Sequence, residues 1–153
     1  MTNLTKIRNS VIAGLCGTVV HSLLALVHGK TGPLPEFQPN EDFRKALSWL
    51  IGQDIHSGVA WLLLFVNGAV IWGFLFGQLY SFLPGKHPWQ KGVVFGICAW
   101  MVMGFVFFPL VGRGIFAVDL GLGAAPAIFL LAMLLTYSVT MSLVYHFLNR
   151  LSA

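Results

Sequence analysis

The chain has 153 residues, of which 57% are hydrophobic and only 9% are charged. A soluble domain carries about 25% charged residues, and it needs polar side chains to cover its surface. The mean hydropathy of +0.81 therefore excludes most soluble enzymes, disordered chains and disulfide scaffolds, and it indicates a chain solvated by a bilayer. The net charge of +4 comes from basic residues that form no run, so we assign it to membrane orientation and expect no nucleic-acid partner.

Four apolar segments are long enough to cross roughly 30 Å of hydrocarbon as helices, which takes about 20 residues each. They are continuous and show no alternation of period two, so a closed barrel is excluded. The sequence therefore predicts an all-α fold, a bundle of four transmembrane helices in a single domain that covers residues 1–153. The predicted spans are residues 10–28, 55–83, 89–111 and 123–148.

The outer loop at residues 29–54 is the largest segment outside the predicted spans. Asn40 is placed to cap a helix in this loop, and apolar residues follow at helical spacing, so we expect a short amphipathic helix at the membrane interface. It would act as a lid over the bundle, although a plain connection is the simpler interpretation. Its apolar residues are Phe43, Ala46, Leu47, Leu50 and Ile51. In the last connection, Arg113 is expected to pair with Asp119 or with an acid of the outer loop.

Basic residues set the predicted orientation of the chain. With the N-terminus inside, the inner ends of the spans carry five basic residues, Lys6, Arg8, Lys86, Lys91 and Arg150. The outer side carries four, Lys30, Arg44, Lys45 and Arg113, together with all five acidic residues, which count for little in this rule. This bias predicts a multi-pass membrane protein with both termini in the cytoplasm. The alternative, that a secretory signal begins the chain, is disfavoured because the first apolar segment has full span length and no small-x-small cleavage site follows it.

Small residues recur at helical spacing in three of the predicted spans. Small side chains let helix backbones approach closely in lipid, so the pattern indicates tight helix packing. Packing within the chain is one interpretation, and packing against another membrane protein is the functional one. The glycines concerned are Gly14, Gly17, Gly73, Gly77, Gly92, Gly96 and Gly104.

Polar side chains at membrane depth are expensive and therefore informative. His21 lies near the middle of the first span, and Asn67 and Thr136 reach a similar depth in the second and fourth spans. We expect these residues to form a central polar cluster. A simple interhelical hydrogen bond would account for it, and a path for protons or a small solute is the functional alternative.

Two histidines are expected near the outer ends of their spans. His28 leaves the first span and His56 enters the second, and Asp54 stands just before His56. Imidazoles beside a carboxylate can together bind a metal ion. Two histidines on facing helices at matched depth can serve as the axial ligands of haem b. A metal or haem b bound through these residues is therefore an alternative, alongside the simpler interpretation of two interfacial histidines and a helix-capping aspartate.

Several short motifs, taken together, resemble a known group of proteins. A glycine-rich first span precedes Pro33-x-Pro35, and His56 stands at the head of the second span. Further motifs are Pro84, Trp89-x-x-Gly92 with Gly96, and Phe108-Pro109-x-x-Gly112. This set resembles the small four-span bacterial inner-membrane proteins of a family of unknown function. The resemblance implies a four-helix membrane bundle and implies no activity.

The sequence contains no paired carboxylates, nucleophile triad or zinc-protease spacing that would indicate an enzyme. We therefore expect a non-enzymatic accessory or structural subunit that lies in the lipid bilayer. Its glycine faces would pack against a larger membrane complex or a second copy of the chain. The alternatives are the haem- or metal-binding redox protein and a small-solute or proton transporter.

Overall fold

The computed structural model describes residues 3–31 and 39–152, while the side chains of residues 28–31, 39 and 40 lie outside this description. The predicted cap Asn40 is among those side chains. The elements are α1 (Asn3–Thr31), α2 (Pro39–Ile51), α3 (Ser57–Val66), η1 (Asn67–Trp72), α4 (Gly73–Leu79), α5 (Pro88–Val102), η2 (Met103–Phe107), α6 (Phe108–Leu110), η3 (Ile115–Leu120) and α7 (Ala125–Leu151).

Across the described residues, four helices are long and apolar enough to cross a membrane, as predicted. The second is α3, η1 and α4 in one continuous rod, and the third is α5, η2 and α6. Both rods contain a π-helical segment, η1 or η2, in which the backbone hydrogen-bond register is locally widened. These spans are Asn3–Val27, Ser57–Leu79, Pro88–Leu110 and Ala125–Leu151. They confirm the predicted all-α membrane bundle.

The ends of the spans differ from the predicted ones for local reasons. The first helix begins at Asn3, before the predicted residue 10, because its first turns lie outside the apolar segment and carry the exposed Lys6 and Arg8. The second span is shorter than predicted, and Gly85, at φ +133°, turns the chain beyond it. The fourth span begins after Gly123, whose φ of +60° is left-handed and favours glycine.

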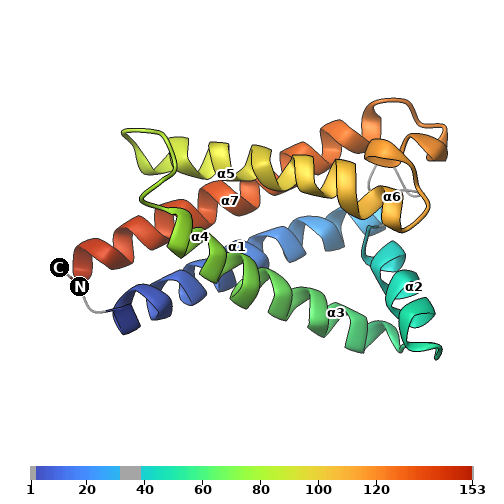
Figure 1. The fold of residues 1–153 in the computed structure, drawn as a ribbon, viewed down its shortest axis with the longest axis horizontal. Coiled ribbons are helices and arrows are strands. Elements are labelled where there is room, and N and C mark those ends of the chain that lie inside the picture. Colours follow the sequence, from blue (N-terminus) through green and yellow to red (C-terminus); the bar gives the residue numbers. More distant parts are fainter. Residues whose placement is uncertain (1–2, 32–38, 153) are drawn as a thin grey trace.

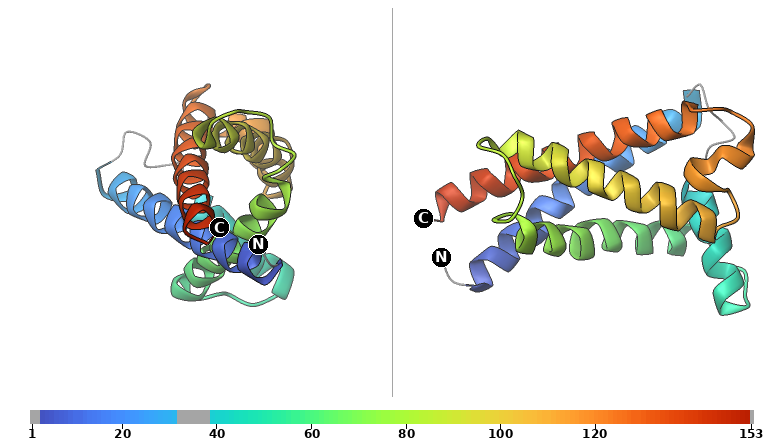
Figure 2. Two further views of the ribbon diagram at one scale, coloured as in Figure 1. Left: turned by 90° about the vertical axis from the view of Figure 1, so that its left-hand side faces the viewer. Right: turned by 45° about the horizontal axis from the view of Figure 1, so that its top comes forward.

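The four spans run alternately up and down (Figure 1). Both chain ends and the 80–87 turn lie together at one end of the bundle, which we call the terminal end (Figure 2). The helix α2 and the 111–124 connection lie at the opposite end, which we call the α2 end. Along the bundle, α7 packs between α1 and α5, while α1 crosses the second span near η1 and α4.

The helix α2 is the short helix expected in the first connection, and it lies steeply inclined to the four spans (Figure 1). Phe43 and Leu47 are half-buried on its inner side. Leu50 and Ile51, which we expected on the same apolar face, are 74% and 56% exposed because the C-terminal turn of α2 projects beyond the bundle.

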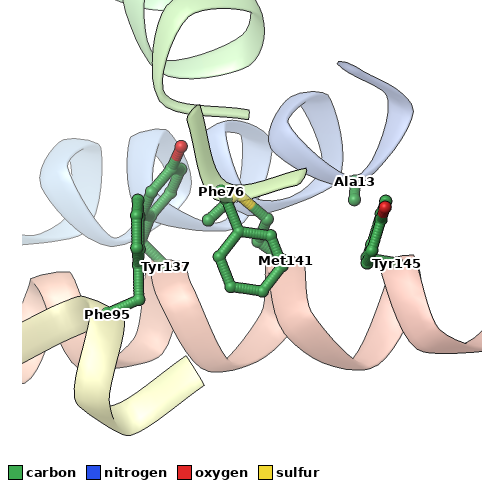
Figure 3. Packing of buried hydrophobic residues seen from close by; sticks show 6 residues of the cluster. All are labelled: Ala13, Phe76, Phe95, Tyr137, Met141 and Tyr145. Atoms are coloured by element: carbon green, nitrogen blue, oxygen red, sulfur yellow. The ribbon is translucent and has the colours of Figure 1, made fainter. Parts of the chain in front are cut away.

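Aromatic side chains fill the core of the bundle near the terminal end. The ring of Phe76 meets those of Phe95 and Tyr145 edge to face, at centroid distances of 5.1 and 5.7 Å. Figure 3 shows how side chains from four helices converge here, and the buried members are Ala13, Phe76, Phe95, Tyr137, Met141 and Tyr145. Lipid tails are as apolar as the helix surfaces, so the hydrophobic effect does not drive the helices together. Close aromatic contacts such as these therefore supply much of the packing energy.

Glycines bring the helices into backbone contact. A Cβ atom added to Gly73 would lie 2.8 Å from the Ser10 carbonyl oxygen and 3.0 Å from the Gly14 Cα atom. A Cβ atom added to Gly92 would lie 2.8 Å from the Ser138 carbonyl oxygen. Separations this short leave no room for a side chain, so α1 against α4 and α5 against α7 depend on these glycines.

Candidate functional site

The predicted central histidine lies in α1, where it faces α7. The His21 ring meets the ring of Tyr137 edge-on, with centroids 6.2 Å apart, and forms a hydrogen bond with the backbone of Met133. Its Nδ1 atom is buried and has no hydrogen-bond partner among the described residues. An unsatisfied buried nitrogen near the middle of a membrane span is costly, so His21 is an unusual feature of this bundle.

Tyr137 completes the polar contacts around His21. Its hydroxyl donates a hydrogen bond of 2.7 Å to the Gly68 carbonyl, which belongs to the π-helical segment η1. The Thr18 side chain meets the same hydroxyl and donates to the Gly14 carbonyl at 2.8 Å. The buried polar cluster therefore joins α1, η1 and α7. The sequence analysis did not include Tyr137 in the polar cluster. Its position inside a span, between Thr136 and Ser138, could have indicated that it belongs there.

The other two predicted members of the cluster lie elsewhere. Asn67 is half-buried at the start of η1, next to Gly68. Thr136 lies on the exposed side of α7, and its hydroxyl donates to the Ala132 carbonyl of the same helix at 2.9 Å. Thr136 is therefore satisfied within its own helix and takes no part in the buried cluster.

Each of the described members of the predicted metal set has a local partner. His56 caps α3, because its Nδ1 atom accepts a hydrogen bond of 3.1 Å from the Gly58 N–H. Asp54 is exposed and pairs with Arg44 at 2.9 Å. The His28 side chain lies outside the described part, and no three His, Cys, Asp or Glu side chains inside that part are grouped to hold a metal. Ligation through His28 and His56 stays a prediction.

A buried ion pair ties α2 to the connection that follows α6. Arg113 donates from Nε and Nη2 to the Oδ1 atom of Asp42, at 3.0 and 2.7 Å. Asp42 is only 4% exposed, and its Oδ2 atom has no hydrogen-bond partner in the described residues. The hydrogen bond with Asp42 raises the pKa of Arg113, which therefore stays charged. Of the two partners that the sequence allowed for Arg113, the structure selects the acid of the first connection, while Asp119 stays exposed.

An open pocket of about 410 Å³ lies beside this ion pair. It is bounded on one side by α2 and on the other by the end of α6 and the turn that follows. Its lining combines the ion pair with a further lysine and with apolar side chains. The lining residues are Asp42, Lys45, Ala46, Trp49, Leu110, Val111, Gly112 and Arg113.

A tyrosine, a lysine and a histidine meet at the terminal end. Lys91 donates to the Tyr80 carbonyl at 2.7 Å, and its ammonium lies 4.4 Å from the centre of the Tyr80 ring. The Tyr80 hydroxyl is 3.4 Å from Nδ1 of His146. Burial, with a smaller effect of Tyr145, raises the pKa of Tyr80, so this phenol stays neutral at physiological pH. These contacts fasten the 80–87 turn to α5 and α7.

The glycines predicted to pack helices all meet other parts of the same chain. On α1 and α4, Gly14, Gly73 and Gly77 lie at the crossing of these two helices. Gly17 meets Tyr137, and Gly104 meets the ring of Phe116. On α5, Gly92 and Gly96 both meet α7 at Ser138. The glycine faces are thus occupied within the bundle, so a partner protein would need another face.

Comparison with known proteins gives a family and no activity. Residues 4–152 match the "Family of unknown function (DUF6789)". No curated protein and no solved structure matches the chain. The match covers nearly the whole chain and agrees with the family type that the sequence motifs implied.

Proposed function

Because the chain belongs to the DUF6789 family, whose function is unknown, we propose its role from its own residues: a non-enzymatic accessory or structural subunit. It is a membrane protein with four apolar helices, and most of the described residues lie in these spans. Two polar groups at the α2 end have structural roles, because His56 caps α3 and Arg113 holds Asp42. This arrangement favours a role in packing and assembly.

One exposed face of α7 carries the proposal. Ala132 and Thr136 are both exposed on α7, one helical turn apart, and Thr140 follows half-buried one turn later. Small residues at this spacing allow the backbone of another helix to approach closely. The Thr136 hydroxyl bonds to the Ala132 carbonyl, so this face can meet either lipid or protein without an unsatisfied donor. We call Ala132, Thr136 and Thr140 the α7 face, and we place the partner helix there.

Co-purification tests the proposal. The variant Thr136→Leu fills the α7 face with a bulky side chain, and we expect it to lose the partner while the bundle itself stays folded. Cys98→Leu is the matched control, because Cys98 is also a small exposed residue inside a span. Both proteins are extracted gently from their own membrane, and the mass of the native complex is measured. Retention of the same partner by both variants would contradict a partner on the α7 face, and a partner of identical mass would identify a homo-oligomer.

We also propose that the terminal end faces the cytoplasm of a bacterial inner membrane. The supporting observation is the distribution of basic residues: Lys6, Arg8, Lys86, Lys91 and Arg150 belong to this end, and three basic residues of the described part, Arg44, Lys45 and Arg113, belong to the α2 end. In a background without Cys16 and Cys98, an impermeant maleimide added to intact spheroplasts should label Gln53→Cys and spare Ser81→Cys. The reverse labelling would invert the orientation.

A further inference from the structure

We propose that the pocket at the α2 end binds the phosphate of a phospholipid headgroup. This proposal is independent of the α7 face, because it concerns other residues at another place. The pocket lies where the third span ends, since its lining residue Leu110 is the last residue of that span. It therefore lies at the level where the hydrocarbon of a bilayer gives way to lipid headgroups.

Charge in the pocket favours a monoanionic group. The lining contains two cations, Lys45 and Arg113, and one carboxylate, Asp42, which leaves one net positive charge. A phosphodiester carries one negative charge, so it would neutralise the site. Arg113 uses Nε and Nη2 on Asp42, while its Nη1 atom forms no hydrogen bond within the described part. Nη1 and Lys45 are therefore the donors that remain for a phosphate.

Lys45 is available for a ligand. It is exposed on α2, and it takes part in no ion pair among the described residues. The neighbouring Arg44, in contrast, pairs with both Glu41 and Asp54. A lysine with no partner on the rim of a pocket is suited to bind a phosphate as a mobile point charge.

The apolar part of the lining distinguishes a lipid from a free anion. Trp49 is 84% exposed and Leu110 is 79% exposed, and both border the pocket. Tryptophan is enriched at the membrane interface, where its ring lies at the level of the headgroups. A free phosphate would leave these side chains uncovered, whereas the glycerol and upper acyl groups of a phospholipid would pack against them. The pocket thus combines a phosphate site with an apolar wall.

Native mass spectrometry of the full chain in detergent tests this assignment, with phosphatidylglycerol as the probe. We expect the protein to retain one phosphatidylglycerol molecule, and Lys45→Gln to lower this retention roughly three- to tenfold. Lys45 forms no ion pair with another described residue, so this variant should fold. The matched control is Lys86→Gln, which removes an exposed lysine from the terminal end and should retain the lipid like the parent.

Two further probes separate the parts of the proposal. Diacylglycerol has the same apolar groups without the phosphate, and inorganic phosphate has the anion alone. Retention of diacylglycerol as strong as that of phosphatidylglycerol would overturn a phosphate site. Release of the bound lipid by millimolar inorganic phosphate would assign the pocket to a free anion and overturn the lipid. Equal losses in Lys45→Gln and Lys86→Gln would reduce the binding to general charge attraction and would also overturn the proposal.

Discussion

At the scale of single residues, the pair of Asp42 and Arg113 fixes α2 against the rest of the molecule. The carboxylate is buried, and both of its hydrogen bonds to Arg113 end on the same oxygen atom. Removal of one partner from a buried pair leaves an uncompensated charge, and this loss is what makes such pairs matter for stability. We therefore expect this contact to stabilise the docked position of α2.

We predict that Arg113→Gln frees α2. The buried Asp42 carboxylate would lose its cation, at a cost of about 1–3 kcal/mol for an unsatisfied buried group. Hydrogen exchange of the α2 amides in detergent should become about tenfold faster or more, because local opening follows this free energy. Lys86→Gln removes a positive charge at the terminal end, away from α2, and its α2 amides should exchange like those of the parent. Unchanged exchange in Arg113→Gln would show that other contacts hold α2.

The polar contacts of Tyr137 and His21 differ in what they contribute to stability. Tyr137→Phe leaves the Gly68 carbonyl without its donor, so we expect the free energy of unfolding to fall by about 1–2 kcal/mol. His21→Phe removes the hydrogen bond with the Met133 backbone together with an Nδ1 atom that has no described partner, so we expect a smaller loss than in Tyr137→Phe. Thermal unfolding in detergent, followed by circular dichroism, measures both. A loss in His21→Phe as large as that in Tyr137→Phe would contradict this ranking.

The sequence predicts the depth of a residue in a span, but it does not predict which residue on a neighbouring helix that residue contacts. The depth of His21 followed from the helical rise and the start of the apolar segment. The partner of a tyrosine hydroxyl depends on how two helices cross, so Tyr137 and the Gly68 carbonyl could not be paired from spacing. For Arg113 the sequence allowed either Asp119 or an acid of the first connection, and only the docked position of α2 selects Asp42.

At the scale of elements, glycine contacts determine how closely the helices approach. A Cβ atom on Gly14 would meet the Ala69 carbonyl and would lie 2.8 Å from the Gly73 Cα atom. Because both neighbours are backbone atoms, they move only when the helices separate. The crossing of α1 and the second span therefore tolerates no side chain at Gly14.

We predict that Gly14→Ala lowers the free energy of unfolding by about 1–3 kcal/mol, which is the usual range for overpacking. The control is Leu15→Ala on the same helix turn, because Leu15 is 43% exposed and its removal opens no backbone contact. In lipid the exposed Leu15 has little packing to lose, so this variant should unfold near the parent temperature. Equal unfolding temperatures for the two variants would contradict the close crossing.

The elements were predicted well where apolar length alone defines them. The four spans and the short α2 followed from hydropathy and helical spacing, and the glycine pattern indicated the tight helix faces. The π-helical segments η1 and η2 could not be predicted, because they depend on the contacts of each span with its neighbours. The prediction of one buried apolar face on α2 was partly wrong, because Leu50 and Ile51 lie beyond the helices that would cover them and are exposed.

At the scale of the whole molecule, small residues occur both at the internal helix contacts and on the exposed α7 face, where we propose that a partner helix packs. The glycines of α1, α4 and α5 are used inside the bundle, and the α7 face is left on the outside. The α2 end adds a polar cap with a pocket at the level of the lipid headgroups. In the described part, the molecule is thus a membrane bundle whose glycines pack internally and whose α7 face, the place proposed for a partner helix, points outward.

Photocrosslinking in the native membrane tests this claim most directly. A photoreactive residue is placed at Thr136 on the α7 face and, as the control, at the exposed Cys98 on α5. The account predicts a discrete crosslinked polypeptide from position 136, which mass spectrometry would identify, and only lipid adducts from position 98. Lipid adducts alone from both positions would contradict it, because the α7 face would then be covered by the bilayer.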